Sequence, residues 1–250
     1  MIHLKSHDEI ERIFEAGKIV AEAHEAVETL IEPGISTLEL DAAAERVIRQ
    51  RKAKPAFLGY QGYPATLCAS INEEVVHGIP SAKRILKDGD LIGIDLGAII
   101  NGWFGDAARS HIVGKGSKVA EKLNQATRES LQEAIHVMLP GKRLGDIGHA
   151  VQAYVEKRGF SVVRQFVGHG IGKALHEDPQ VMNYGRRNTG VRLQEGMVLA
   201  VEPMINEGVF EVEILDDGWT VVTQDGCRVR APSTSTRQTR QEPGLLTPSK

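Results

Sequence analysis

The chain has 250 residues, of which 41% are hydrophobic and 25% charged, and its formal net charge is -3 at pH 7. This composition is typical of a globular protein with one or two domains and a sizeable buried core. It excludes a disordered or collagenous chain, and the balance of 30 basic against 33 acidic residues gives no electrostatic footprint for nucleic acid or an anionic membrane.

The two cysteines, Cys68 and Cys227, are too few for a disulfide framework, which indicates a reducing compartment. The N-terminal segment has no apolar signal core, and no later run approaches the ~20 apolar residues of a membrane span. We therefore expect a cytoplasmic protein that binds neither nucleic acid nor membranes.

Two amphipathic helices are predicted at the start of the chain. Ser6 and Glu9 have the spacing of a capping box, and apolar residues then recur at helical spacing until the Pro-Gly pair at 33–34. The same spacing predicts a second helix over residues 38–52, which ends before a proline.

The turn residues of the first half recur in the second half. Pro33-Gly34 returns as Pro140-Gly141, a shift of 107 residues. The same shift carries Asp95, near the end of one apolar strand, onto Glu202, at the end of another. We interpret this as an internal duplication in which each half contributes one strand-borne carboxylate.

Residues 91–113 are predicted to form a β-hairpin, because two apolar runs flank Asn101-Gly102, the dipeptide best suited to a type I′ turn. The resulting register places Asp106 opposite Gly97. Asp95 and Asp106 then lie on one face as diagonal neighbours, about 7–8 Å apart. Such acids are commonly surface residues, but in a buried strand an ionised acid needs a partner, and two at this separation can share a cation.

The second half adds histidines to these acids. A predicted strand over residues 161–167 leads into a glycine-flanked His169, which suits a metal ligand, although a structural histidine in a turn is the alternative. His77 and His176 occupy loops, one in each half. Carboxylates with one imidazole favour Mn, Fe, Co or Zn, and a metal pair bridged by an acid activates water against a carbonyl or phosphoryl group.

Six motifs together resemble the type I methionine aminopeptidases over roughly residues 5–226. They are Asn72-Glu-Glu-Val-Val-His77-Gly-Ile-Pro, Ile94-Asp95-Leu-Gly, Gly105-Asp106, Gly168-His169-Gly-Ile-Gly, Leu175-His176-Glu-Asp-Pro and Val201-Glu202-Pro-Met204. The resemblance implies the pita-bread fold, an α/β (α+β) architecture of two pseudo-symmetric halves with helices packed on a curved antiparallel sheet. We expect a single catalytic domain over residues 1–226, with halves at about 5–113 and 114–226.

Residue roles follow from the resemblance, motif by motif. The implied metal ligands are Asp95, Asp106, His169 and Glu202. Glu202 is also implied to relay protons, while His77 and His176 contact the substrate and the tetrahedral intermediate. The implied pocket wall around the methionine side chain consists of Tyr60, Tyr63, Cys68 and Trp219.

The implied activity is that of a metalloaminopeptidase, a hydrolase that removes the initiator methionine by metal-activated water, with two divalent ions (Co, Mn, Fe or Zn) per chain. The expected partners are nascent polypeptide N-termini, with the ribosome as the candidate place of action, and the expected state is a monomer. Two alternatives stay open: a Xaa-Pro aminopeptidase of the same fold, and a non-catalytic scaffold or defective copy.

The chain departs from the family over residues 227–250. The family's fifth ligand, a bridging glutamate, belongs 31 residues after Glu202, where this sequence has Ser233. The segment is basic and lacks apolar alternation, which predicts an aberrant or disordered tail. We therefore expect at most one tightly held metal and reduced activity.

A frameshift would explain the departure. Residues 231–236 can be encoded as GCG CCC AGT ACG AGC ACA followed by CG. Read from its third base, that string gives Ala-Gln-Tyr-Glu-His-Thr, which contains the missing motif. The nucleotide sequence tests this hypothesis.

Overall fold

The computed structural model describes residues 1–230, 233–237 and 244–245. The helices of this part are α1 (His7–Glu28), α2 (Thr37–Gln50), α3 (Lys118–His136), α4 (Leu144–Glu156) and the short 3-10 helix η1 (Tyr60–Gly62). The strands are β1 (Lys54–Pro55), β2 (Leu67–Ile71), β3 (Glu74–Val76), β4 (Leu91–Ile100), β5 (Trp103–Ile112), β6 (Ser161–Val162), β7 (Gly168–Gly170), β8 (Glu177–Val181), β9 (Val198–Val201), β10 (Ile205–Asn206), β11 (Val212–Ile214), β12 (Val221–Thr223), β13 (Val229–Arg230), β14 (Ser233–Arg237) and β15 (Gly244–Leu245).

The first two helices form as the sequence predicts. Ser6 caps α1 and Glu9 closes the capping box, and Ser36 and Glu39 do the same for α2. Each box satisfies two backbone N–H groups that the first helical turn leaves without partners. Both helices end two or three residues before the expected positions, which is the usual uncertainty of a helix end.

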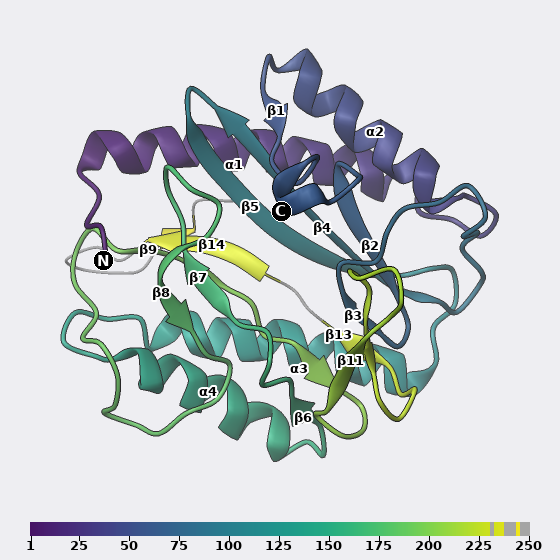
Figure 1. The fold of residues 1–250 in the computed structure, drawn as a ribbon. Coiled ribbons are helices and arrows are strands. Elements are labelled where there is room, and N and C mark those ends of the chain that lie inside the picture. Colours follow the sequence, from purple (N-terminus) through teal and green to yellow (C-terminus); the bar gives the residue numbers. More distant parts are fainter. Residues whose placement is uncertain (231–232, 238–243, 246–250) are drawn as a thin grey trace.

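One large antiparallel sheet runs through both halves of the molecule. Its strand order is β1-β4-β5-β14-β9-β7-β8, with β2 also paired to β4 and β15 to β14. The long hairpin of β4 and β5 crosses Figure 1 diagonally, and β14 lies between it and β9. The sheet therefore joins strands from residues far apart in the sequence.

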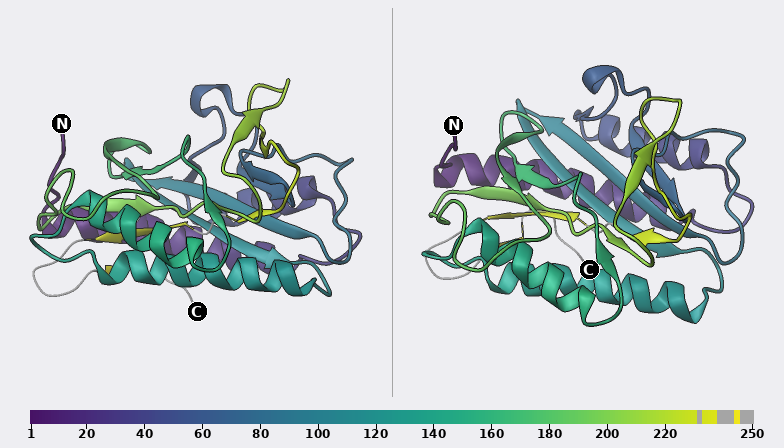
Figure 2. Two further views of the ribbon diagram at one scale, coloured as in Figure 1. Left: turned by 90° about the horizontal axis from the view of Figure 1, so that it is seen from below. Right: turned by 60° about the horizontal axis from the view of Figure 1, so that its bottom comes forward.

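Both helix pairs cover the same face of this sheet. In β4, Ile92, Ile94 and Leu96 belong to the core that α1 and α2 bury. In β9, Leu199 and Val201 belong to the core that α3 and α4 bury. Figure 2 shows the helices on one side of the sheet and loops on the other. The alternate residues of β4 and β9 consequently face away from the helices.

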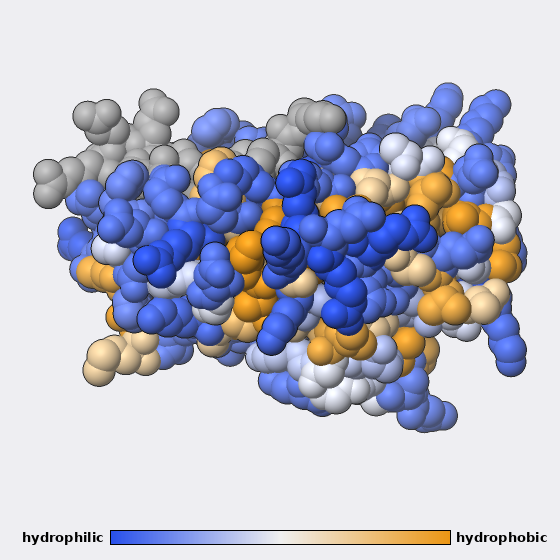
Figure 3. All heavy atoms as spheres, turned by 90° about the horizontal axis from the view of Figure 1, so that it is seen from above, coloured by the Kyte–Doolittle hydropathy of each residue, from blue (hydrophilic) through white to orange (hydrophobic). Residues whose placement is uncertain are grey.

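None of the helices in the described part of the chain is long and apolar enough to cross a bilayer. The face seen from above in Figure 3 is mainly hydrophilic, with apolar side chains in small separate patches. The large apolar side chains of α1 and α2 thus lie mostly in the core beneath this face.

Matching contacts in the two halves support the duplication that we propose from the sequence. Gly34 N donates to Leu86 O, and Gly141 N donates to Leu193 O. The two donors differ by the predicted shift of 107 residues, and so do the two acceptors. The isolated bridge between residues 36 and 85 has a counterpart between residues 143 and 192 at the same shift.

Two expectations need correction. The strand predicted over residues 161–167 is limited to β6, because the pairing with β10 covers only two residues. The tail expected from Cys227 remains attached in its first residues, since Val229 is buried and pairs with Asn206. The segment that follows pairs as β14 and β15, whereas the tail residues 231–232, 238–243 and 246–250 lie outside the described residues.

Candidate metal centre

The hairpin register that the sequence predicts is confirmed. Asp106 pairs with Gly97, and Asp95 pairs with Ala108. Side chains of a strand alternate between faces, so Asp95 and Asp106 project from the same face, the one turned away from the helices. This arrangement follows from the two-residue turn, which leaves the strands only one register.

The second half supplies an imidazole and a further carboxylate on this face. His169 in β7 pairs with Ala200 in β9, and Glu202 follows β9 directly. His169 Nε2 lies 3.1 Å from Glu202 Oε1 and 3.5 Å from Asp106 Oδ2. Residues from β5, β7 and the end of β9 therefore converge on one point.

Two glycines allow β7 to approach its neighbours. A Cβ at Gly168 would lie 2.2 Å from Ala200 O, and a Cβ at Gly170 would lie 2.2 Å from Asp178 O. Only residues without a Cβ fit between β9 and β8 at these two positions. The glycines around His169 thus set the spacing of the strands that carry it.

The hydrogen bond of His169 directs its other ring nitrogen to the acids. Nδ1 lies 2.9 Å from Gly170 O, and because a carbonyl oxygen only accepts, Nδ1 carries a proton. In the neutral ring, Nε2 then points a lone pair at Asp106 and Glu202. Three acceptors that face one another require a proton or a cation between them.

The pKa shifts of the site residues also indicate that positive charge is needed between them. Burial, together with the nearby Asp106 and Glu202, raises the pKa of Asp95 well above its usual range. Burial also raises the pKa of Glu202, although His169 opposes the shift. For His169 burial acts in the opposite direction, but Glu202 and Asp106 outweigh it and raise the pKa to about 11. The site thus favours binding of positive charge.

The residues present fit a divalent metal. Ligand atoms of Asp106, His169 and Glu202 all lie within 4.8 Å of one another. Asp95 stands outside this trio, yet its Oδ1 is buried and has no hydrogen-bond partner among the described residues. An imidazole nitrogen with carboxylate oxygens is a donor set for borderline and hard divalent ions, and a buried carboxylate atom without a partner is what an ion would satisfy.

A cavity of about 200 Å³ opens above the acids. All ten residues that the sequence analysis singled out line it, namely Tyr60, Tyr63, Cys68, His77, Asp95, Asp106, His169, His176, Glu202 and Trp219. Sequence reasoning missed Phe57, Gln61, Val76, Phe166, Val167, Leu175 and Met204 in the wall. Apolar residues such as Phe166 carry no chemical signature, and only the fold shows that they face a cavity.

Aromatic contacts shape the cavity. The ring of Tyr63 packs edge-on against Trp219 with centroids 5.1 Å apart, and the ring of His77 lies edge-on to Phe166 at 5.9 Å. His77 has φ of 62°, a left-handed conformation that non-glycine residues rarely adopt outside constrained loops. Burial lowers the pKa of His77, so the ring is neutral at pH 7.

His176 is fixed next to the acids. Its Nδ1 lies 2.8 Å from the Tyr60 hydroxyl, and its ring centroid is 4.4 Å from that of His169. Burial, with added repulsion from His169, lowers the pKa of His176 to about 4. A neutral ring held in this way leaves Nε2 for a group inside the cavity.

Known proteins resemble the chain closely in sequence. The model of metallopeptidase family M24 matches residues 11–230. Methionine aminopeptidase 1 of Bacillus subtilis is 53% identical over 226 residues, which are 90% of this chain and 91% of that protein. A methionine aminopeptidase of Clostridium acetobutylicum is 51% identical over 226 residues, 90% of each chain.

The chain belongs to metallopeptidase family M24, among the methionine aminopeptidases.

Solved structures agree with this family. A methionine aminopeptidase of Thermotoga maritima has a TM-score of 0.98, with 44% identity and full coverage of both chains. The prolidase of Pyrococcus horikoshii has a TM-score of 0.81 at 24% identity, and the match covers 99% of this chain but 64% of that one, so it shows the fold alone. The pita-bread fold is confirmed, and membership in the family implies use of a divalent metal.

Proposed function

We propose that the chain removes methionine from the N-termini of nascent proteins and peptides. The observation that supports this most directly is the cavity of Tyr60, Tyr63 and Trp219 with the acid and imidazole cluster at its floor. Such a cavity accommodates one apolar side chain beside a metal centre. The names of the relatives supply the identity of that side chain as methionine.

The chain's own residues divide the catalytic work. Asp95, Asp106, His169 and Glu202 would hold the metal. A bound divalent ion supplies Lewis-acid chemistry, because it polarises a carbonyl and lowers the pKa of water. Glu202 takes a proton from the attacking water and returns it to the leaving amine.

The two cavity histidines act on the substrate. When Tyr60 donates its hydroxyl proton to His176 Nδ1, the neutral ring carries its own proton on Nε2. That N–H then donates to the oxygen of the scissile peptide as negative charge develops there. His77, which lines the same cavity and packs edge-on against Phe166 and Trp219, contacts the substrate as well.

The metal complement differs from that of the family in our proposal. With Ser233 in place of an acid, Asp106, His169 and Glu202 would supply three protein ligands to one ion among Co, Mn, Fe and Zn. Asp95 and Asp106 would supply two ligands to a second ion. Three protein ligands would hold an ion more tightly than two carboxylates would.

We further propose a cytoplasmic, monomeric enzyme whose partners are nascent polypeptide N-termini at the ribosome. A non-catalytic scaffold is the second candidate, and the serine at position 233 favours it. The Xaa-Pro alternative has the support of solved structures at 24% identity or less, and this likeness concerns the fold alone.

The test is hydrolysis of Met-Ala-Ser by the purified chain with each of the four metals added separately. We expect release of free methionine, none from Ala-Pro-Ser, and loss of release in Glu202→Gln. Release of alanine from Ala-Pro-Ser in preference would favour the Xaa-Pro alternative. Absence of hydrolysis with every metal would favour the scaffold.

A further inference from the structure

The segment before α1 is tied to the loop that carries His176. Lys5 Nζ donates to Glu177 Oε2 at 2.5 Å, across 172 residues of sequence. The Lys5 side chain is only 3% exposed and that of Glu177 18%. Burial alone would raise the pKa of Glu177, but Lys5 and two backbone N–H groups lower it, so the carboxylate is charged.

Glu177 in turn closes the loop between β7 and β8. Its Oε1 accepts hydrogen bonds from Lys173 N at 2.7 Å and from Ala174 N at 3.2 Å. The ion pair also packs on this loop, since a Cβ at Gly172 would lie 2.7 Å from Lys5 Cε and 2.8 Å from Glu177 Oε1. The carboxylate therefore joins the N-terminal segment and the loop at one point.

His176 belongs to this closed loop and lines the cavity. It precedes Glu177 in the chain, and its position is otherwise fixed by the hydrogen bond to Tyr60 on the exposed rim. The other end of the loop is held where Phe104 N donates to Gly172 O at 2.9 Å. If Glu177 loses its cation, the carboxylate is left poorly compensated beside His176.

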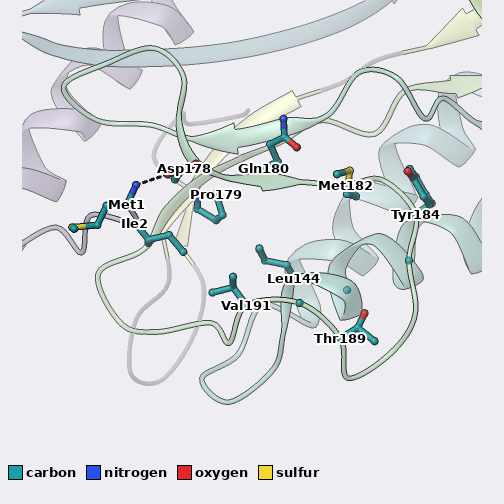
Figure 4. Close-up of a pocket in the computed structure, with 13 residues that line it drawn as sticks. Met1, Ile2, Leu144, Asp178, Pro179, Gln180, Met182, Tyr184, Thr189 and Val191 are labelled. Carbon is teal, nitrogen blue, oxygen red and sulfur yellow. Dashed lines mark hydrogen bonds and ion pairs between the residues drawn. The ribbon is translucent and has the colours of Figure 1, made fainter.

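The backbone of the N-terminal segment holds Lys5 in place. Lys5 N donates to Gly196 O at 2.7 Å, and Nζ also donates to His3 O at 3.1 Å. Farther out, Figure 4 shows the Met1 ammonium paired with Asp178, and Ile2 lining the same cavity of about 680 Å³ as Pro179. The Met1 pair is exposed and contributes little, so Lys5 is the effective link.

We propose that Lys5 is a positioning residue of the aminopeptidase reaction, which fixes His176 through Glu177 and the 172–176 loop. The inference rests on the proposed function, because it assumes that His176 contacts the reacting peptide. It assigns Lys5, which precedes the N-cap of the first helix, a role in turnover that none of the sequence motifs indicated.

The experiment compares the wild-type chain with Lys5→Met, which keeps an unbranched side chain one atom shorter and removes the charge, and with Lys5→Arg, which keeps the charge. Val151→Ala is the matched control, because it truncates a fully buried side chain of α4 that does not line the cavity, and so lowers stability through the core. Kinetics on Met-Ala-Ser, bound metal per chain, melting temperature and hydrogen exchange of the peptide covering residues 172–178 are measured for all four.

For Lys5→Met we expect kcat to fall about tenfold to a hundredfold, the range that a displaced reactive group costs, with KM changed less than about twofold. Metal content stays at the wild-type value, while the amides of Lys173 and Ala174 lose protection. Lys5→Arg recovers part of both losses. Val151→Ala lowers the melting temperature without changing kcat or exchange in the loop.

Wild-type kcat and loop protection in Lys5→Met would overturn the proposal, as would an equal loss of kcat in Val151→Ala. If the wild-type chain shows no turnover with any metal, the proposed function fails. The hydrogen-exchange measurement on residues 172–178 still decides whether Lys5 fixes the loop. Unchanged protection of Lys173 and Ala174 in Lys5→Met would then refute the link by itself.

Discussion

Replacing Ser233 by glutamate restores an acid at the position where the family has its fifth ligand. Ser233 pairs with Ala108 of β5, which pairs in turn with Asp95 of β4. On the other side, the pairing of Thr234 with Val201 brings position 233 opposite Glu202. Strands are about 4.8 Å apart, so the Cα atoms of residues 95 and 233 are ~10 Å apart, a span that two acidic side chains and a shared cation can bridge.

The magnitude follows from the ligand count. In our proposal the weaker metal position would have Asp95 and Asp106, and Ser233→Glu would add a third carboxylate with two oxygens and a negative charge. Alteration of a partner that merely orients a ligand commonly costs about 10- to 100-fold in metal affinity or activity. A direct ligand contributes at least as much. We therefore expect the second dissociation constant to fall by at least that factor and turnover to rise with it.

Metal titration followed by calorimetry, with bound metal counted by elemental analysis, measures the effect. Ser233→Gln is the matched control, because glutamine has nearly the same size as glutamate and lacks its charge. Two equally tight metals and ordinary turnover in the wild-type chain would refute the reasoning and point to another bridging acid, such as Glu242, which lies outside the described residues. Identical titrations of the glutamate and glutamine variants would refute it as well.

Three further predictions concern the site, the substrate and the core. Asp106→Asn and His169→Ala should each lose bound metal by elemental analysis, and unchanged content in both would remove these residues from the site. Met-Ala peptides should be cleaved and Met-Lys peptides should not, because a crowded metal centre penalises a bulky second residue; equal rates on both would contradict this. Burial, with Arg109 and His111 nearby, lowers the pKa of His24 to about 3 in the folded chain. In the unfolded chain the pKa of this histidine has its ordinary value of 6.5, so the unfolded chain binds the proton first as the pH falls. Urea unfolding should therefore show stability falling between pH 6.5 and 3 by up to about 1.4 kcal/mol per pH unit from this residue, and His24→Gln should flatten that slope.

Local patterns predicted the features that depend on local geometry. Asn101-Gly102 sets a two-residue turn, and this alone places Asp95 and Asp106 on one face of β4 and β5. Capping residues marked the start of α1, because the first helical turn must satisfy its free N–H groups nearby. Such features involve residues a few positions apart, where the chain has few alternatives.

Contacts between distant residues could not be predicted in this way. The Tyr60 hydroxyl meets His176 across 116 residues, and Lys5 meets Glu177 across 172. No pattern of sequence spacing predicts either pair, since both contacts depend on how the two halves pack against each other. Family motifs brought His176 to the site, but a lysine before a helix resembles any surface lysine until its burial is known.

The strand that closes the sheet explains why fold and metal chemistry are separable in this chain. In the strand order, β14 stands between β5 of the first half and β9 of the second. A strand pairs through backbone N–H and C=O groups, which every residue of Ser233–Arg237 carries. The pairing of β14 with β5 and β9, which we call the seam, therefore tolerates a change of side chains. In our proposal, the second metal position depends instead on the side chain at position 233. Ser233→Glu should therefore change metal binding and turnover while leaving the circular dichroism of the apo chain as it is. A variant that gained helix and strand content together with metal would show that the wild-type seam is not closed, and the separation argued here would fail.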